Sequence, residues 1–332
     1  MENFRANNGA IPRIGVIGCG NIGSWLDEDK DLPYALSHCG AYQLLKIPIL
    51  ALADPNEARL QTAGNKRNVK KLYTNAIDLI QKEAIDILNI CTPTSIRYPL
   101  IKKAVENKVK VIICEKPLAN TVEEGEKIKA LIEQSDTQLI VNYSRRWDVI
   151  IQKIKSLIQT KQIGEIQHIS AIYGKGLLNN GSHLINLFQF FFGNNYTVEY
   201  TKIVSDDMPE KGKTMHAVLH GHWNNQTFPI FLKAVNHQMF SLFEIDIVGT
   251  EKRIKISESG LTIEFQQVIE DTRFKGYKAL QKEKISKDSY YDTMANMIKE
   301  AIHIFQNKQE DSVSSISDAL DTLKIIDTIY QT

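Results

Sequence analysis

The 332-residue sequence has little of what marks a secreted, disulfide-rich or nucleic-acid-binding protein. Its four cysteines, Cys19, Cys39, Cys91 and Cys114, form no C-x-x-C element, so we interpret them as buried free thiols of a reducing cytosol. The 40 basic and 39 acidic side chains nearly cancel and leave a net charge of +1. Such a chain has no general field to attract nucleic acid or an anionic membrane.

Long apolar runs are missing too. The most apolar stretch, 184–192, is far too short to span a membrane, and the polar residues 1–9 lack the apolar core of a signal peptide. Repeats, low-complexity tracts and long linkers are also missing. With 43% apolar and 24% charged residues, the sequence predicts a cytoplasmic globular protein large enough for two domains.

The first 140 residues alternate apolar strands with amphipathic helices. Continuous apolar runs such as 85–91 and 109–114 are typical of strands buried on both faces, which favours a parallel sheet covered by helices. The predicted strands lie at 13–17, 47–53, 71–73, 85–91, 109–114 and 138–142. The predicted helices lie near 37–42 and at about 56–64, 76–82, 98–107 and 121–135.

The second half changes to segments that alternate apolar and polar residues between turn signals, which predicts a meander of mostly antiparallel strands. These strands are expected at 167–173, 197–204, 214–222, 228–235, 240–248, 253–257 and 261–266, with helices at 149–160, 289–307 and 315–330. We therefore expect an α/β Rossmann domain over 1–145. An α+β domain with a large open sheet should follow over 146–332, its final helices packing back on the first domain.

The most specific motif is Gly18-x-Gly20-x-x-Gly23, directly after an apolar strand. Gly18 permits the tight turn out of the strand, Gly20 leaves room for a pyrophosphate, and Gly23 lets the next segment pack closely. Asp54 ends the second strand, where a carboxylate binds both adenosine ribose hydroxyls and repels a 2′-phosphate. The motif predicts a dinucleotide site with NAD favoured over NADP.

Asp54 lies 54 − 23 = 31 residues beyond Gly23, whereas the usual spacing is about 20. The surplus matches the acidic segment 24–35, which contains Pro33. Two interpretations stay open: a surface insertion, or a loop that closes over cofactor or substrate. The insertion also leaves open whether a helix N-terminus faces the pyrophosphate directly after Gly23.

Ligands of parallel α/β sheets bind at the carboxyl ends of the strands, and several polar residues of this chain occupy those ends. Lys116 follows the fifth strand, so its ammonium can stabilise a developing alkoxide, and Glu115 can orient a neighbour. We expect the cofactor-binding residues to be Gly18, Gly20, Asn21, Ile22, Gly23, Asp54, Thr92, Pro93, Glu115, Lys116 and Asn142.

His183 precedes an apolar helix face formed by Leu184, Leu187, Phe188 and Phe191. If Ser182 or Asn180 caps this helix, His183 lies in its first turn. There the positive end of the dipole favours a neutral imidazole, the form that a general base requires. A half-buried structural histidine remains the alternative.

These motifs together resemble the glucose–fructose oxidoreductase / inositol dehydrogenase (Gfo/Idh/MocA) family over residues 12–330. The matching segments, in order, are 18–23, 53–55, 91–93, 115–119, 142–147, 181–183 and 244–249. The resemblance implies a nucleotide-binding domain, a second domain whose open sheet forms a homodimer or homotetramer, and NAD(P)-linked oxidation or reduction of a sugar or cyclitol hydroxyl. Segments 142–146 and 174–183 resemble members linked to nucleotide sugars and bacterial surface polysaccharides.

By position in the family, Lys116 and His183 are the catalytic pair, and either could be the proton acceptor. Arg146, Tyr173 and Asn179, with His183, are the expected substrate-binding residues. Three positions depart from the common family pattern: Asn179 and Asn186 replace aspartates, and Arg97 replaces a histidine. The changes at Asn179 and Asn186 motivate the alternative of a non-catalytic dinucleotide-binding sensor or regulator.

His216, His220 and His222 should share one face of a strand. No carboxylate or thiolate accompanies them at ligand spacing, so we assign them to a sheet face or subunit interface and expect no metal site. The serine-rich segment 311–318 is typical of a capped helix start.

Overall fold

The computed structural model describes residues 11–27, 33–205, 212–307 and 311–332. The chain divides into two compact units. Unit 1 comprises the chain up to Trp147 together with Tyr291–Leu320, and unit 2 comprises Asp148–Tyr290 together with Asp321–Thr332. Among the described residues, no helix combines the length and apolar character needed to cross a membrane.

Unit 1 is built on a six-stranded parallel sheet in the order β3-β2-β1-β4-β5-β6. Its strands are β1 (Ile14–Ile17), β2 (Ile49–Ala53), β3 (Lys71–Tyr73), β4 (Ile87–Ile90), β5 (Val111–Glu115) and β6 (Gln138–Asn142). Every residue of β1, β4 and β5 is buried, as their continuous apolar sequences predict.

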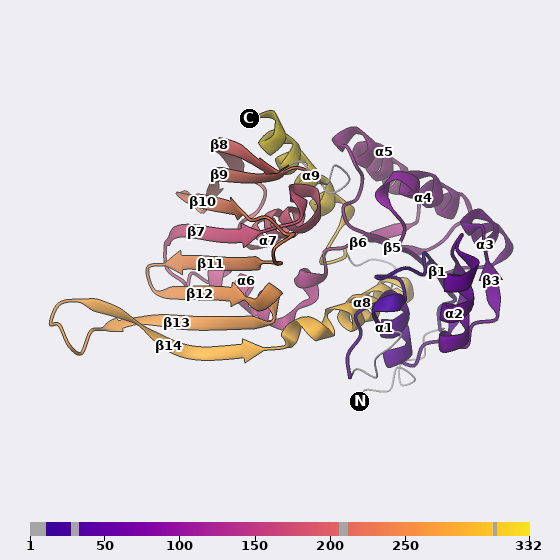
Figure 1. Ribbon diagram of the computed structural model, residues 1–332, viewed down its shortest axis with the longest axis horizontal. Helices are drawn as coiled ribbons and strands as arrows, with labels where there is room; N and C mark the ends of the chain where they lie inside the picture. Colours follow the sequence, from indigo (N-terminus) through magenta and orange to yellow (C-terminus); the bar gives the residue numbers. More distant parts are fainter. Residues whose placement is uncertain (1–10, 28–32, 206–211, 308–310) are drawn as a thin grey trace. The chain divides into compact units, whose positions relative to one another are not determined.

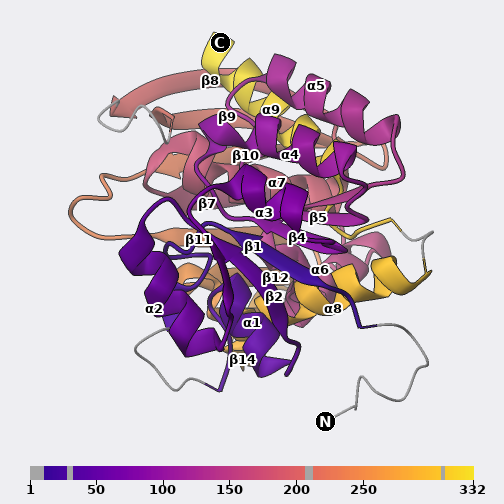
Figure 2. The ribbon, with the colours of Figure 1, turned by 90° about the vertical axis from the view of Figure 1, so that its right-hand side faces the viewer.

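Helices cover both faces of this sheet (Figure 2). The helices between its strands are α1 (His38–Leu44), α2 (Glu57–Arg67), α3 (Ala76–Lys82), α4 (Arg97–Glu106) and α5 (Val122–Glu133). From near the end of the chain, α8 (Thr293–Asn307) packs into the same core, where Met297, Ile298 and Ala301 are buried among Ile14 and Trp147. The predicted Rossmann architecture is confirmed.

Unit 2 contains an eight-stranded sheet in the order β14-β13-β12-β11-β7-β10-β9-β8 (Figure 1). Its strands are β7 (Ile166–Tyr173), β8 (Tyr196–Ser205), β9 (Thr214–Trp223), β10 (Gln226–Ala234), β11 (Phe243–Gly249), β12 (Lys252–Ser257), β13 (Thr262–Glu270) and β14 (Lys278–Lys287). Only β7 and β10 pair in parallel among these described strands, so the predicted mostly antiparallel sheet is confirmed.

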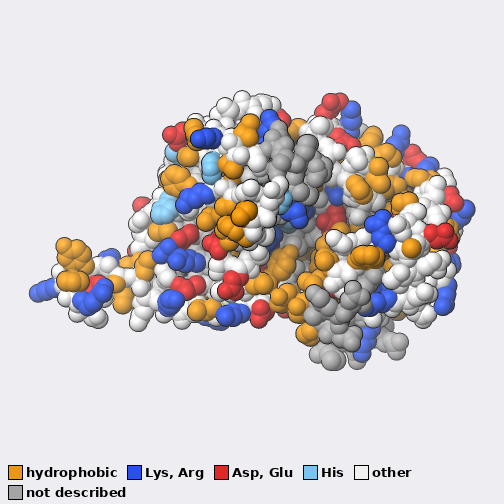
Figure 3. Space-filling view, in the orientation of Figure 1, with side chains coloured by type: hydrophobic (Ala, Val, Ile, Leu, Met, Phe, Trp, Pro, Cys, Tyr) orange, Lys and Arg blue, Asp and Glu red, His pale blue; other side chains and the backbone are white. Residues whose placement is uncertain are grey.

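The burial of side chains alternates along the central strands of unit 2, as in β11, where Phe243, Ile245 and Ile247 are buried and the residues between them are half-buried. The inner face packs against α6 (Val149–Gln159), α7 (Ser182–Phe192) and the unit 2 part of α9 (Ile316–Gln331). The other face is open, and charges of both signs are mixed over the visible surface (Figure 3).

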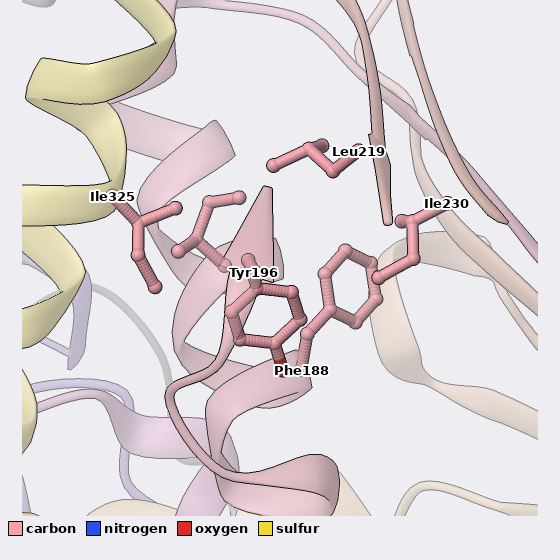
Figure 4. Close-up of a pocket in the computed structure, with 6 residues that line it drawn as sticks. Phe188, Tyr196, Leu219, Ile230 and Ile325 are labelled. Atoms are coloured by element: carbon pink, nitrogen blue, oxygen red, sulfur yellow. The ribbon is translucent and has the colours of Figure 1, made fainter. Parts of the chain in front are cut away.

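A small apolar cavity lies in the core of unit 2, between α7, α9 and the sheet (Figure 4). It is lined by Ile185, Phe188, Tyr196, Leu219, Ile230 and Ile325. The Tyr196 hydroxyl is buried there without a hydrogen-bond partner among the described residues, and burial raises the pKa of this phenol. Apart from this hydroxyl the lining side chains are aliphatic or aromatic, so we interpret the cavity as a packing gap.

Candidate functional site

The glycine turn after β1 has the geometry that its three glycines predict. Gly18 adopts a φ of +93°, and a Cβ there would lie 2.7 Å from the Cys91 carbonyl oxygen. A Cβ on Gly23 would lie only 1.8 Å from the carbonyl oxygen of Gly18. At Gly20 the nearest atom to a Cβ would be Arg59 Nη1 at 3.7 Å, so the space over this residue is open. An approaching pyrophosphate would therefore meet bare backbone at Gly20.

The unusual spacing after this turn is explained by two backbone hydrogen bonds. The amides of His38 and Cys39 donate to the carbonyls of Ile22 and Gly23 at 3.0 and 2.9 Å. In an uninterrupted helix Ile22 would bond to residue 26, so 38 − 26 = 12 residues are inserted. Without them the distance from Gly23 to Asp54 is 31 − 12 = 19 residues, close to the usual ~20. Helix α1 thus resumes the helical turn begun at Gly20.

The base of this insertion is held closed by a buried carboxylate. The two oxygens of Asp27 accept hydrogen bonds from the amides of Leu36 and Ser37, both at 2.8 Å, and from the Ser37 hydroxyl. The Ser37 side chain in turn caps α1 at the Gly40 amide. Tyr34 stacks on Tyr291 of the same unit, with ring centroids 3.7 Å apart.

Asp54 lies at the end of β2 beside the glycine turn. Its carboxylate accepts the amides of Cys19 and Asn56, both at 2.8 Å, and its Oδ1 lies 3.8 Å from Arg59 Nε. A cavity of about 430 Å³ adjoins the turn, which is a size typical of small-molecule sites. It is lined by Gly20, Asn21, Trp25, Asn56, Ala58, Arg59 and Thr62.

A buried polar network lies behind the carboxyl ends of β4, β5 and β6. His38 is fully buried, and its Nε2 lies 2.9 Å from Glu115 Oε1 while its Nδ1 lies 2.9 Å from Asn89 Oδ1. Asn142 Nδ2 donates to the same Glu115 oxygen at 2.6 Å. Burial is the largest influence on the Glu115 pKa and raises it, but His38, Asn142 and the Arg97 charge lower it below its ordinary value overall.

The neighbours of Asn89 settle which of its side-chain atoms faces His38. Asn89 Nδ2 donates to the Gly15 carbonyl at 3.2 Å and to the Tyr42 hydroxyl at 2.9 Å, so its Oδ1 is the atom that faces the imidazole. Both ring nitrogens of His38 therefore face oxygen acceptors. His38 thus bridges Asn89 and the Glu115 carboxylate through its two ring nitrogens.

Arg97 holds the backbone on both sides of Lys116. It is almost fully buried, and its guanidinium donates to the Thr92 carbonyl at 3.0 and 2.9 Å and to the carbonyls of Glu115, Lys116 and Pro117. A planar, multidonor group is needed to serve several carbonyls at once. Arg97 therefore ties the end of β4 to the segment that carries the half-buried Lys116.

Two further expected residues fit a bound polar ligand. Thr92 Oγ1 and Asn142 Oδ1 are buried and have no hydrogen-bond partner among the described residues, at the ends of β4 and β6. Buried polar atoms are normally satisfied, so these two are suited to receive groups from a ligand. With the open backbone at Gly20 and the Asp54 carboxylate, they fit a dinucleotide laid along the strand ends of unit 1.

In unit 2, His183 is 9% exposed and its ring meets that of Phe243 edge-on, with centroids 6.4 Å apart. The predicted capping of its helix is wrong. A π-helical turn, Gly176–Gly181, leads directly into α7, and the Ser182 hydroxyl donates to the Asn179 carbonyl. Because the helical backbone begins before Ser182, His183 does not lie in a first turn with free amides, so the helix dipole gives no reason to expect a neutral imidazole.

Two expected substrate-binding residues have structural partners instead. The Tyr173 hydroxyl is fully buried and exchanges hydrogen bonds with the backbone of Met215 at 2.7 and 3.1 Å. Arg146 is 2% exposed, donates to the Val313 carbonyl at 2.9 Å and pairs with Asp318 at 3.0 Å. Both groups therefore have partners within their own units, and their contact with a substrate stays a prediction.

The strand histidines of unit 2 have protein partners. His216 accepts the Ala234 amide, His220 pairs with Glu199 at 2.7 Å, and His222 lies between Thr197 and Thr227. Glu199 lies on the neighbouring strand, so sequence spacing gave no sign of this carboxylate. The four cysteines are all free thiols, as predicted, and burial raises the pKa of Cys114 to about 11.

Sequence reasoning missed His38 as a member of the site and assigned no function to Arg97 or Trp25. Removing the twelve inserted residues places His38 three residues after Gly23, in the first turn of the nucleotide-binding helix. The unusual spacing between Gly23 and Asp54 was visible in the sequence. The hydrogen bonds to the Ile22 and Gly23 carbonyls were needed to show where the helix resumes.

Residues 12–143 match the model of the GFO_IDH_MocA oxidoreductase family, described as its NAD-binding Rossmann fold. Among curated proteins, D-apiose dehydrogenase of Rhizobium rhizogenes is 25% identical over 231 residues, which cover 63% of this chain and 66% of that protein. The chain thus matches about two thirds or less of the length of its first curated relatives.

Two solved structures cover nearly the whole chain and show its fold. The WlbA dehydrogenase of Bordetella pertussis, in complex with NADH and UDP-GlcNAcA, is 16% identical with a TM-score of 0.71, covering 97% of this chain and 96% of its own. KijD10, a 3-ketoreductase of Actinomadura kijaniata in complex with TDP-benzene and NADP, is 14% identical with a TM-score of 0.76, covering 97% and 98%. The glycine turn and strand ends described above thus lie in the part of the chain, residues 12–143, that matches the NAD-binding Rossmann fold of the Gfo/Idh/MocA oxidoreductase family.

Proposed function

We propose that the protein is an NAD(P)-dependent dehydrogenase or ketoreductase that acts on a hydroxyl-bearing carbon of a sugar or nucleotide sugar. The observation that carries this proposal lies within unit 1, where the open glycine turn, the Asp54 carboxylate and Lys116 are found at the carboxyl ends of strands of one parallel sheet. The family match and the named activity of the D-apiose dehydrogenase relative support it.

In this proposal a bound nicotinamide would accept or donate the hydride. Side chains of the protein would transfer the proton and hold the substrate oxygen. The Lys116 ammonium holds the substrate oxygen as negative charge develops on it, and His183 takes or returns the hydroxyl proton. Arg97 fixes the carbonyls on both sides of Lys116, and the His38–Glu115 pair holds the residue before it. Asn179 is the proposed substrate-binding neighbour of His183.

We favour NAD over NADP because Asp54 places a carboxylate where the adenosine ribose would bind. Its two oxygens already accept amides from Cys19 and Asn56, so the carboxylate is held in place. Arg59, whose Nε lies 3.8 Å from Asp54 Oδ1, would attract a 2′-phosphate. The preference therefore depends on Asp54 neutralising Arg59.

The proposal is tested by following NADH formation with purified protein, NAD⁺ and a panel of free aldoses, inositols and UDP- or TDP-sugars. The expected result is turnover with at least one sugar class, lost by several orders of magnitude in Lys116→Met and His183→Ala while NAD⁺ still binds. Binding of NAD⁺ without reduction by any member of the panel, in both reaction directions, would argue against a sugar oxidoreductase.

We also propose that unit 2 forms a homodimer or homotetramer through the open face of its sheet. Phe231, Val218 and Val248 lie on that face, and the Phe231 ring meets that of His168 edge-on. Such a half-apolar face is suited to a second copy of the same surface. Light scattering after gel filtration should give a dimer or tetramer, reduced to monomer by Phe231→Glu; a wild-type monomer would refute this.

A further inference from the structure

The segment inserted after Gly23 contributes an aromatic side chain to the cofactor cavity. Trp25 lines the 430 Å³ cavity together with Gly20 and Asn21 on the glycine turn and with Arg59 and Thr62 on α2. Its side chain is not part of the core, because 48% of Trp25 is exposed. A tryptophan left half in water at the wall of a cavity is positioned to cover a ligand rather than to stabilise the fold.

The backbone fixes this position. The Trp25 amide donates to the Gly20 carbonyl at 3.1 Å, so the residue stays within one helical turn of the open glycine. The insertion is anchored at its base by Asp27, which binds Leu36 and Ser37, and by the stacking of Tyr34 on Tyr291. Trp25 is thus presented by a segment held at both ends.

The other walls of the cavity identify the part of a dinucleotide that Trp25 would meet. Asn56, Ala58, Arg59 and Thr62 all follow β2, the strand whose end carries Asp54. This is the ribose and adenine side of the crevice, whereas Lys116 lies at the end of β5. The ligand group against Trp25 would therefore be adenosine rather than nicotinamide.

We propose that Trp25 is a cofactor-binding residue that closes the adenosine side of the cavity by packing its indole on the adenine base. This proposal rests on the dinucleotide site of the proposed function and assigns Trp25, at the start of the insertion, to cofactor binding. Stacking of a base on an aromatic side chain contributes enough to change affinity by about tenfold or more. The indole would also shield Arg59 and the phosphates from water.

The test uses ADP-ribose, which carries the adenosine diphosphate half and no nicotinamide, and measures its Kd by calorimetry on the full chain. Trp25→Ala should weaken ADP-ribose at least about tenfold, whereas Trp25→Phe should retain most of the affinity. Leu26→Ala is the matched control, because Leu26 is the next residue, is 42% exposed and does not line the cavity. It should bind as the wild type does.

A second readout separates stacking from a general effect on the fold. ADP-ribose should quench wild-type tryptophan fluorescence, and the quench should vanish in Trp25→Phe although calorimetry still detects binding. A Trp25→Ala variant within twofold of wild type, or a Leu26→Ala variant that loses as much, would overturn the proposal. If the wild-type protein binds ADP-ribose but oxidises no sugar, the proposed function is refuted. The proposed role of Trp25 in binding the adenosine half would still hold.

Discussion

His38 Nε2 lies 2.9 Å from Glu115 Oε1, and both side chains are buried at the base of the strand ends that carry the proposed site. The pair joins the first turn of the nucleotide-binding helix to the residue immediately before Lys116. Its charge and hydrogen bond help lower the Glu115 pKa against the opposing effect of burial. Helix α1 and the end of β5 are thereby locked together.

Glu115→Gln should destabilise the protein by about 3 kcal/mol at pH 7, because it leaves the buried imidazole without its carboxylate. Denaturant unfolding measures this change. Since the folded pKa of Glu115 is lowered, its contribution is present above the ordinary glutamate pKa of about 4.3 and is lost as the pH falls through the lower folded value. As the pH is lowered from about 5, the free energy of unfolding should therefore fall less in the variant than in the wild type.

Glu123→Gln provides the control for this experiment, because Glu123 is paired with Lys127 on an exposed face of α5. An exposed ion pair of this kind contributes little to the stability of the fold. Equal effects of the two substitutions at pH 7 would show that the buried pair has no special role.

Two glycines of the turn should respond differently to alanine. Gly23→Ala places a Cβ 1.8 Å from the Gly18 carbonyl and should disrupt the turn, lowering both stability and dinucleotide affinity. Gly20→Ala meets no protein atom closer than 3.7 Å, so it should leave the melting temperature within a few degrees while weakening ADP-ribose more than about tenfold. Thermal melting and calorimetry separate the two effects. Unchanged affinity in Gly20→Ala would place the pyrophosphate elsewhere.

Asp54→Ser should move the cofactor preference toward NADP. The substitution removes the carboxylate and leaves Arg59, so a 2′-phosphate gains a cation and loses a repelling anion. The ratio of kcat/KM for NAD to that for NADP should fall by about tenfold or more. Asp54→Ser combined with Arg59→Ala should reverse the gain for NADP. A ratio that does not change would mean that the ribose does not bind at Asp54.

Tyr196→Phe should leave the stability of unit 2 unchanged or raise it by up to about 1 kcal/mol. The hydroxyl lies in an apolar cavity without a partner among the described residues, and a buried unsatisfied hydroxyl costs free energy that phenylalanine avoids. Phe188→Ala, which enlarges the same cavity, should instead destabilise by about 3–5 kcal/mol. Chemical denaturation measures both. A loss of stability in Tyr196→Phe would reveal a partner for the hydroxyl.

Much of the fold could be predicted because most strands show the expected sequence pattern. In unit 1 the strands are continuous apolar runs, and in unit 2 apolar and polar residues alternate. Segments 71–73, 76–82 and 138–142 were predicted to the residue, since each is bounded by clear turn or capping signals. Strand β14 was missed because Lys278–Lys287 is charged on both faces and has no apolar alternation. It is an edge strand that pairs only with β13 in the described sheet, so burial did not shape its sequence.

Candidate site residues could be predicted where their place at the end of a strand determines what they can bind. Gly18, Gly20, Asp54 and Lys116 are of this kind. The site was not predictable where side chains from distant segments meet. Nothing in the sequence near Tyr173 shows that its hydroxyl binds Met215, and nothing near Arg97 shows that it holds four carbonyls. Such contacts depend on tertiary packing, which a local pattern does not specify.

We propose that Lys116 and His183 act on the same reacting group, and a double-mutant cycle can test this pairing. Single-turnover hydride transfer would be measured in wild type, Lys116→Met, His183→Ala and the double variant, each saturated with cofactor. If both residues serve one transition state, each single substitution should slow transfer by orders of magnitude and the double variant should be little slower than the worse single. Transfer at the wild-type rate in either single variant would contradict the claim.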